Sequence, residues 1–166
     1  MLAGLARDGG LYLPAEWPQF SKAEIAALKG QPYGEVAYRV MRPFVGDAFD
    51  EATFRRLIGE AYASFGTPEV APVKPLGDSG MHLLELFHGP TLAFKDIGAR
   101  FMSRCLSFFS SDRQTKTLVI VATSGDTGGA VAAGFESLEA SRSSFSIQRA
   151  ASALFRKVSL PSLVAM

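Results

Sequence analysis

Residues 118–135 read LVIVATSGDTGGAVAAGF, and this stretch decides the fold that we expect. It begins with a continuous apolar run at 118–122, passes through a glycine-rich turn at 123–129 and continues as an apolar helix over 130–135. A continuous apolar run is typical of a strand that is buried on both faces. A strand that leads through such a turn into a helix indicates an α/β domain with a parallel sheet.

The stretch before it has the same order of elements. Residues 81–87 read MHLLELF and predict a second buried strand, His-Gly-Pro at 88–90 ends that strand, and a helix follows over about 92–109. Turns that follow parallel strands gather at the carboxyl edge of the sheet, where ligands of open α/β folds bind. We therefore expect the turns after the two strands to reach one crevice.

The first part of the chain predicts a packed group of helices. A capping box at 21–24 begins the first helix, the second covers 34–42 and ends before Pro43, and Asp50 caps the third. The third helix carries apolar side chains on one face, namely Phe54, Leu57, Ile58, Ala61, Tyr62 and Phe65. Three prolines within residues 67–80 predict a connecting stretch after it.

The composition excludes several classes of protein. Of the 166 residues, 48% are hydrophobic and 20% charged, which is an ordinary globular balance. A net charge of +1 gives no support to a nucleic-acid or membrane-surface partner, and no apolar run reaches the ~18 residues of a membrane helix. Cys105 is the single cysteine, so it forms no internal disulfide, and with only two histidines we expect no metal site. These features predict a cytoplasmic protein.

A lysine at the start of the predicted 92–109 helix is the first candidate for chemistry. A helix N-terminus and apolar neighbours both disfavour the charged form of the Lys95 amine. The neutral amine is the form that Schiff-base chemistry uses. The alternative is a side chain that extends to solvent while Asp96 offsets its charge. For a lysine taken alone, this alternative is the more common outcome.

The turn at 123–129 is the second candidate. Its glycines let the backbone approach a ligand closely, and helix N-terminal amides with the hydroxyls of Ser124 and Thr127 suit a carboxylate or phosphate. Asp126 accepts hydrogen bonds, so it suits a ligand hydroxyl. The alternative is a turn in which Thr123, Ser124 or Asp126 merely caps the helix, and composition does not separate the two. The pattern is neither GxGxxG nor a P-loop, so nucleotide binding is not favoured.

Three stretches, in order along the chain, resemble the threonine synthase family, whose fold is the fold-type II pyridoxal 5'-phosphate (PLP) architecture. They read GLARDGGLYLP at 4–14, LELFHGPTLAFKD at 84–96 and ATSGDTG at 122–128. The resemblance covers about residues 2–136. It identifies the second stretch as the family's cofactor-lysine motif, so that Lys95 would carry PLP on its side-chain amine.

The resemblance also implies roles for the neighbouring residues. Lys95 would move protons on the substrate, Phe94 would pack near the cofactor ring and Asp126 would contact the 3'-hydroxyl of PLP. The loop that holds the substrate carboxylate would consist of Ser124, Gly125 and Thr127. For His88 two alternatives stay open, a position that lines the site and a structural role. Glu85 is expected to have a partner but no role in the site.

The reaction implied by the resemblance is the conversion of O-phospho-L-homoserine and water to L-threonine and phosphate. The alternatives are another fold-type II PLP lyase, such as a threonine-synthase-like phospho-lyase or a dehydratase, and a non-catalytic fragment. Asp126 favours threonine synthase, because dehydratases and cysteine synthases commonly carry asparagine there. The expected partner is the small-molecule substrate, without nucleic acid or membrane, and the oligomeric state stays open.

We expect three segments along the chain. Residues 1–75 predict a mainly helical N-terminal domain, residues 76–136 a partial PLP-binding α/β domain and residues 137–166 an atypical tail. The tail contains no glycine, whereas all sixteen glycines of the chain lie at or before Gly134. The tail does not resemble the family's continuation and supplies no clear apolar strand. We therefore expect an incomplete parallel-sheet domain whose tail is read out of frame, and a truncated chain that is inactive by itself.

Overall fold

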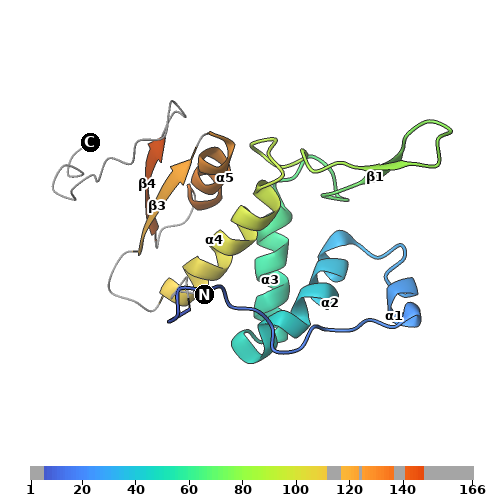
Figure 1. The fold of residues 1–166 in the computed structure, drawn as a ribbon, viewed down its shortest axis with the longest axis horizontal. Helices are drawn as coiled ribbons and strands as arrows, with labels where there is room; N and C mark the ends of the chain where they lie inside the picture. The colour runs from blue at the N-terminus through green and yellow to red at the C-terminus, as the bar shows by residue number, and fades with distance from the viewer. Residues whose placement is uncertain (1–5, 112–116, 124, 137–140, 148–166) are drawn as a thin grey trace.

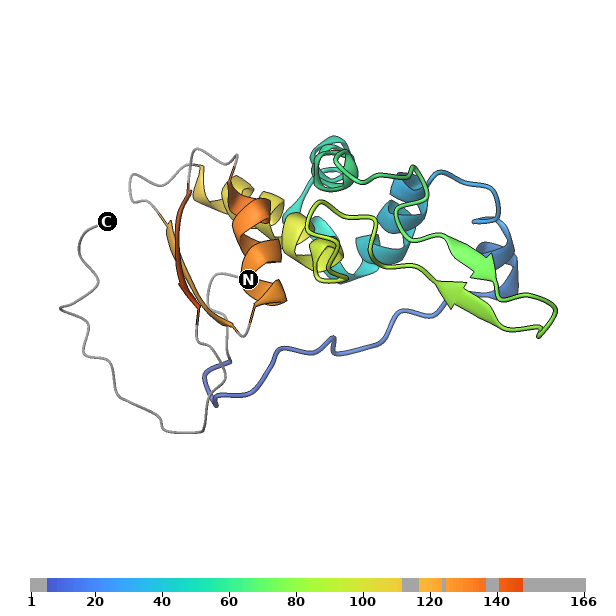
Figure 2. The same cartoon turned by 90° about the horizontal axis from the view of Figure 1, so that it is seen from above.

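The computed structural model describes residues 6–111, 117–123, 125–136 and 141–147. The elements are α1 (Lys22–Ala26), α2 (Tyr33–Val45), the 3-10 turn η1 (Gly46–Ala48), α3 (Glu51–Tyr62), β1 (Val73–Pro75), β2 (His82–Leu84), α4 (Asp96–Ser110), β3 (Thr117–Thr123), α5 (Asp126–Phe135) and β4 (Ser141–Ile147). Helix α4 lies between α3 and α5 in both views of the molecule (Figures 1 and 2). The described part is therefore built around α4.

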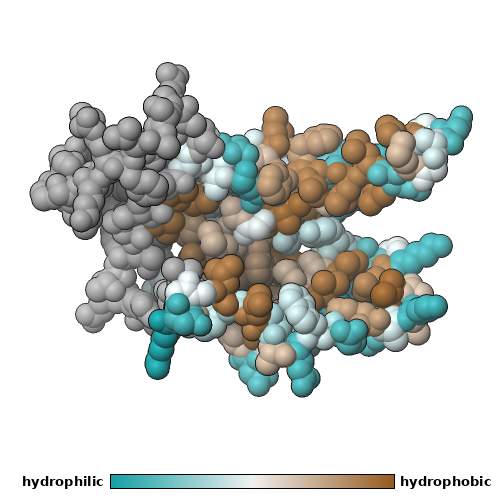
Figure 3. All heavy atoms as spheres, in the orientation of Figure 1, coloured by the Kyte–Doolittle hydropathy of each residue, from teal (hydrophilic) through white to brown (hydrophobic). Residues whose placement is uncertain are grey.

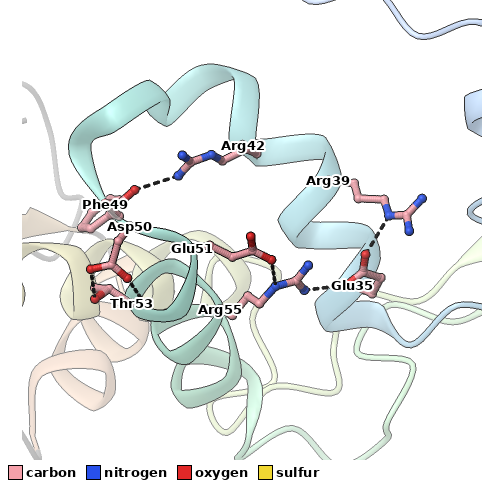
Figure 4. Close-up of polar contacts among 8 residues, drawn as sticks. All are labelled: Glu35, Arg39, Arg42, Phe49, Asp50, Glu51, Thr53 and Arg55. Atoms are coloured by element: carbon pink, nitrogen blue, oxygen red, sulfur yellow. Dashed lines mark hydrogen bonds and ion pairs between the residues drawn. The ribbon is translucent and has the colours of Figure 1, made fainter.

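The caps predicted for α1 and α3 are confirmed. In α1 the amide of Glu24 donates to Ser21 Oγ at 3.2 Å, and the amide of Ser21 donates to Glu24 Oε2 at 2.7 Å. In α3 the amide of Thr53 donates to Asp50 Oδ1 at 2.7 Å, and the Thr53 hydroxyl donates to Oδ2 of the same carboxylate at 2.9 Å (Figure 4). Both side chains satisfy amide donors that have no partner within the first helical turn.

The prediction that the second helix ends before Pro43 is wrong, because α2 runs through the proline to Val45. Proline removes one amide donor and crowds the carbonyl four residues earlier, which here belongs to the exposed residue Arg39. An exposed carbonyl can turn to water instead. The last turn is held from outside the helix, where Arg42 donates from a guanidinium nitrogen to the carbonyl of Phe49 at 2.8 Å (Figure 4).

Among the described residues, two apolar clusters form the core, and α4 contributes to both. The first cluster joins α2, α3 and α4, and its buried members are Ala37, Phe49, Phe54, Leu57, Ile58 and Cys105. The second joins α4, α5 and β3, and its buried members are Ala99, Ala130, Val131 and Phe135. The apolar face predicted for α3 is confirmed, because Phe54 and Ile58 are at most 1% exposed.

A charged network covers the outer side of the contact between α2 and α3. Glu35 accepts from Arg39 at 2.7 Å and also from Arg55, which reaches across from α3 (Figure 4). Arg55 donates to Glu51 at 2.8 Å as well, and its guanidinium carbon lies 3.7 Å from the ring centroid of Tyr38. Exposed ion pairs contribute little stability singly, so the buried aromatic cluster beneath them is the main contact between the two helices.

The interpretation of residues 81–87 as a buried strand of a parallel sheet is wrong. Strand β2 pairs antiparallel with β1, with Val73 opposite Leu84, and the hairpin projects from the helical body (Figure 2). The adjacent residues Leu83 and Leu84 are 49% and 53% exposed, and apolar side chains gather along the hairpin on the face that Figure 3 shows. An apolar run indicates a preference for burial but does not say which surface provides it.

Strand β3 confirms the predicted strand at 118–122, and α5 begins at Asp126, inside the predicted turn. Residues 137–166 contain a strand at 141–147 that its mainly polar sequence, SRSSFSI, did not indicate. This strand, β4, pairs parallel to β3, from Thr117 opposite Ser141 to Thr123 opposite Ile147. The remainder of that segment lies outside the described residues. Within the described ranges, the strands form two separate pairs and not one sheet. No helix in these ranges has both the length and the apolar character needed to cross a membrane.

Candidate functional site

Lys95 precedes α4 as its N-cap residue, so the predicted helix over 92–109 begins four residues late, at Asp96. The reason lies at Leu92, whose φ of 59° places its backbone in the left-handed region. A right-handed helix requires negative φ, so residues 92–95 form a turn instead. The Lys95 side chain is partly exposed at the end of this turn. The backbone carbonyl of Lys95 accepts a hydrogen bond from the amide of Ala99 at 2.9 Å.

The amine of Lys95 meets the carboxylate of Asp126. Lys95 Nζ donates to Asp126 Oδ2 at 2.6 Å, across 31 residues of sequence. Asp126 is the first residue of α5, and α5 packs against α4, so the two helix N-termini lie side by side (Figure 1). The prediction that the two motifs meet is confirmed. The predicted route is wrong, because packing of two helices brings them together and not the edge of one sheet.

The electrostatics of the pair follow from this contact. The hydrogen bond from Lys95, with its positive charge, holds the pKa of Asp126 below its ordinary value. The alternative in which Asp96 offsets the charge of Lys95 is not what the structure shows. Asp96 is completely buried and accepts hydrogen bonds from Thr91, whereas Lys95 is paired with Asp126.

The aromatic ring of Phe94 lies beside the same amine. Lys95 Nζ is 4.6 Å from the centroid of the Phe94 ring, and Phe94 is 58% exposed. An exposed ring next to a lysine amine provides a flat apolar surface against which a planar ligand can pack. The structure thus places Phe94 close to the position that a cofactor on Lys95 would occupy.

Thr123 organises the turn between β3 and α5. Its hydroxyl oxygen accepts the amides of Gly125 and Gly128, each at 3.1 Å. Gly125 has a φ of 153°, which favours glycine, and a Cβ on Gly128 would lie only 2.4 Å from Thr123 Cγ2. The N-cap residue of α5 is Gly125, and the Thr123 hydroxyl accepts an amide of the first helical turn, while the carboxylate of Asp126 is directed at Lys95.

The candidate loop for the substrate carboxylate is described in part. Gly125 is exposed and Thr127 is partly buried, both at the N-terminus of α5. The amide of Thr127 donates to Asp126 Oδ1 at 2.9 Å. Ser124 lies outside the described residues.

His88 and Glu85 form a pair of their own. His88 Nε2 lies 2.8 Å from Glu85 Oε2, and the carbonyl of His88 accepts the amide of Gly66 at 2.9 Å. These contacts favour a structural role for His88 and give Glu85 the partner that the sequence predicts. Among the described residues, no group of three or more histidine, cysteine or acidic side chains is placed to hold a metal ion.

Sequence reasoning missed the residues that hold the turn before Lys95, namely Gly89, Thr91 and Asp96. The buried Asp96 carboxylate accepts both the amide and the hydroxyl of Thr91, at 2.8 and 2.7 Å. A Cβ on Gly89 would lie 2.4 Å from Asp96 Oδ2, so only glycine allows this approach. The available signal was an acidic residue in the first turn of a helix that follows a Gly-Pro-Thr turn.

Comparison with known sequences relates this chain to one family. Residues 1–62 match the family model described as the threonine synthase N terminus. The chain is 46% identical to threonine synthase of Pseudomonas aeruginosa over 134 residues. This aligned region covers 81% of this chain and 28% of that relative. The chain is 38% identical over 135 residues to threonine synthase of Escherichia coli K12, covering 81% of this chain and 30% of the relative.

Comparison with solved structures gives the same relationship. The fold matches PLP-bound threonine synthase from Brucella melitensis with a TM-score of 0.81 and 44% identity, covering 87% of this chain and 31% of that chain. It matches yeast threonine synthase with a TM-score of 0.79 and 30% identity, and the match covers 86% of this chain and 31% of the yeast chain. The chain spans less than a third of the length of these relatives.

Proposed function

We propose, from the premise that this chain is related to the N-terminal part of threonine synthases, that Lys95 is the residue that binds pyridoxal 5'-phosphate. The observation that carries the proposal is the 2.6 Å contact between Lys95 Nζ and Asp126 Oδ2, which unites the two motifs whose residue types suit a ligand. The related threonine synthase from Brucella melitensis is bound to PLP, which supports the same assignment.

The chemistry of the described donors fits this cofactor. PLP carries an aldehyde that reacts with a primary amine, a ring hydroxyl that can donate to a carboxylate, and a flat aromatic ring. Lys95 provides the amine, Asp126 the carboxylate and Phe94 a ring beside them. We propose that Asp126 accepts a hydrogen bond from the ring hydroxyl once the amine of Lys95 is engaged.

We propose further that the site takes part in the conversion of O-phospho-L-homoserine and water to L-threonine and phosphate. PLP supplies the electron sink that stabilises negative charge next to the substrate amine. Once the substrate amine displaces it from the cofactor, the partly exposed Lys95 Nζ would accept and return protons at the substrate carbons. The amides and hydroxyls of Ser124, Gly125 and Thr127 would bind the substrate carboxylate.

The finer description of the fold is part of the same proposal. We propose a fold-type II domain that begins within residues 76–136, preceded by a helical domain over residues 1–75. The parallel pairing of β3 with β4 and the packing of α5 against α4 support the first part, and the aromatic cluster of α2 and α3 supports the second.

The experiment that tests the proposal adds PLP to the purified chain and records the visible absorbance spectrum. We expect a band near the violet edge of the visible range that is absent in Lys95→Ala and retained in Lys22→Ala, since Lys22 is an exposed residue of α1. Absence of the band in the wild-type chain, or its survival in Lys95→Ala, would contradict the proposal. Release of inorganic phosphate from O-phospho-L-homoserine then tests the reaction separately from cofactor binding.

A further inference from the structure

The turn that delivers Lys95 to the site contains a buried carboxylate that does not contact the lysine. Asp96 is 0% exposed, although it neighbours a partly exposed lysine in the sequence. A buried aspartate without compensating donors is costly, so its hydrogen bonds indicate what the group does. The carboxylate accepts two hydrogen bonds from Thr91, five residues earlier.

These two bonds close the chain around residues 92–95. The amide of Thr91 donates to Asp96 Oδ2 at 2.8 Å, and its hydroxyl donates to Asp96 Oδ1 at 2.7 Å. Within the closed segment, the amide of Leu92 donates to the carbonyl of Gly89 at 3.0 Å, and the amide of Asp96 to the carbonyl of Ala93 at 3.0 Å. Thr91 and Asp96 thus join the start of the turn to the first residue of α4.

The same segment contains a strained residue. Leu92 has a φ of 59° and a side chain that is 73% exposed, so no apolar burial compensates its left-handed backbone. Such a conformation is strained for a residue other than glycine and persists only where the surroundings determine it. The bonds between Thr91 and Asp96, which bracket Leu92, are the contacts that determine it here.

A backbone hydrogen bond at His88 anchors the start of the turn, and nearby groups compensate the negative charge of Asp96. The carbonyl of His88 accepts the amide of Gly66, which follows α3, at 2.9 Å. The positive end of the α4 dipole favours the Asp96 carboxylate. Burial, and next the positive charge of Arg104, lower the pKa of Arg100, which is 7% exposed one turn further along α4, and the negative charge of Asp96 acts in the opposite direction.

We propose that Thr91 and Asp96 are positioning residues for the cofactor lysine, because their hydrogen bonds fix residues 92–95 in the turn that directs Lys95 Nζ at Asp126. The role rests on the function proposed above for Lys95. It is distinct from that of Asp126, which contacts the lysine itself. Thr91 and Asp96 act through the backbone, so loss of their bonds misplaces the amine without removing any group that touches it.

The test compares Thr91→Val with Thr91→Ser in the full chain. Each protein is treated with PLP and then borohydride, and peptide mass spectrometry gives the ratio of cofactor fixed on Lys95 to cofactor fixed on the exposed Lys22. Valine keeps the shape of threonine but removes the hydroxyl donor, and we expect the ratio to fall about tenfold, the size that loss of one hydrogen bond to a charged group can produce. Serine keeps the hydroxyl, and we expect it to retain the wild-type ratio.

Circular dichroism at the labelling temperature checks that each variant is folded. Asp96→Asn provides a second variant, which retains an acceptor oxygen but removes the charge. We expect its ratio to lie between those of the wild type and Thr91→Val. If Lys95 is labelled selectively in the wild type and equally well in folded Thr91→Val, the positioning role is overturned while the cofactor assignment stands. If wild-type Lys95 is labelled no better than Lys22, the proposed function fails, and the positioning role fails with it.

Discussion

At the scale of single residues, the carboxylate of Asp126 is held in its charged form by its contact with Lys95. Its pKa lies below the ordinary value of about 3.9 because the lysine donates a hydrogen bond and a positive charge. When the pKa of a carboxylate is lower in the folded than in the unfolded protein, the carboxylate stabilises the fold at every pH above its unfolded-state pKa. That contribution is lost as the pH falls through the folded-state pKa. The contact between Lys95 and Asp126 should therefore open only under strongly acidic conditions.

A carboxyl-carbon NMR titration checks this pH dependence. We expect the midpoint of Asp126 to lie below that of an ordinary aspartate and to rise toward about 3.9 in Lys95→Met, which removes the charge and keeps the length of the side chain. Asp50 is the internal control, since the Thr53 amide is the main cause of its lowered pKa and its midpoint should not move. An unchanged midpoint for Asp126 in Lys95→Met would show that another group perturbs it.

The residues that touch one another at the site differ in how far the sequence predicts them. Lys95 and Asp126 were predicted as neighbours because each follows an apolar run expected to be a strand of one parallel sheet, although it is the packing of α4 against α5 that brings them together. The bonds from Thr91 to Asp96 were not predicted, because they form only when Leu92 adopts a left-handed backbone, and a leucine gives no local sign of that. The residue types offered one signal for this part of the site, the acidic residue after the Gly-Pro-Thr turn, but no sign of the rare backbone conformation on which it depends.

At the scale of elements, the start of α5 contains two adjacent glycines in opposite environments. Around Gly129 there is open space, so Gly129→Ala should stabilise the helix by roughly 0.5–1 kcal/mol. At Gly128 an added methyl group would lie 2.4 Å from Thr123 Cγ2, so Gly128→Ala should instead destabilise the fold by roughly 1–3 kcal/mol. Urea unfolding of the two single variants measures both free energies.

The double variant Thr123→Ser with Gly128→Ala gives the control for this pair. Serine lacks the Cγ2 methyl group but keeps the hydroxyl that accepts the amides of Gly125 and Gly128. We expect the added serine substitution to recover most of the stability lost in Gly128→Ala. Equal effects of alanine at positions 128 and 129 would mean that the close approach to Thr123 does not constrain the turn.

The elements themselves were predicted to different degrees, for physical reasons that differ. The face and cap of α3 follow from local spacing, so Asp50 and Phe54 were placed correctly. The end of α2 was misplaced because an exposed carbonyl tolerates Pro43 in the last turn. The surroundings of β2 were misjudged because its partner is β1, and an apolar run does not identify its partner. Local signals predicted the helices, whereas strand pairing depends on segments elsewhere in the chain.

At the scale of the whole molecule, buried arginines of α4 connect the ends of two other helices. Arg100 Nε donates to the carbonyl of Ala61, in the last turn of α3, at 3.2 Å, and a guanidinium nitrogen of the same residue donates to the carbonyl of Ala133, in α5, at 3.4 Å. Arg104 donates to the carbonyl of Gly134 at 3.1 Å. Cations at helix C-termini are favourable, so these contacts join α3 and α5 through α4.

The position of α4 in both apolar clusters has a consequence for how the molecule unfolds. One cluster cannot open without exposing a face of the helix on which the other depends, so the two should lose structure in one cooperative transition. Phe54→Ala, which should cost about 3–5 kcal/mol in the first cluster, is then expected to speed amide hydrogen exchange in α5 as much as in α3. Unchanged exchange in α5 would show instead that α4 separates two independent folding units.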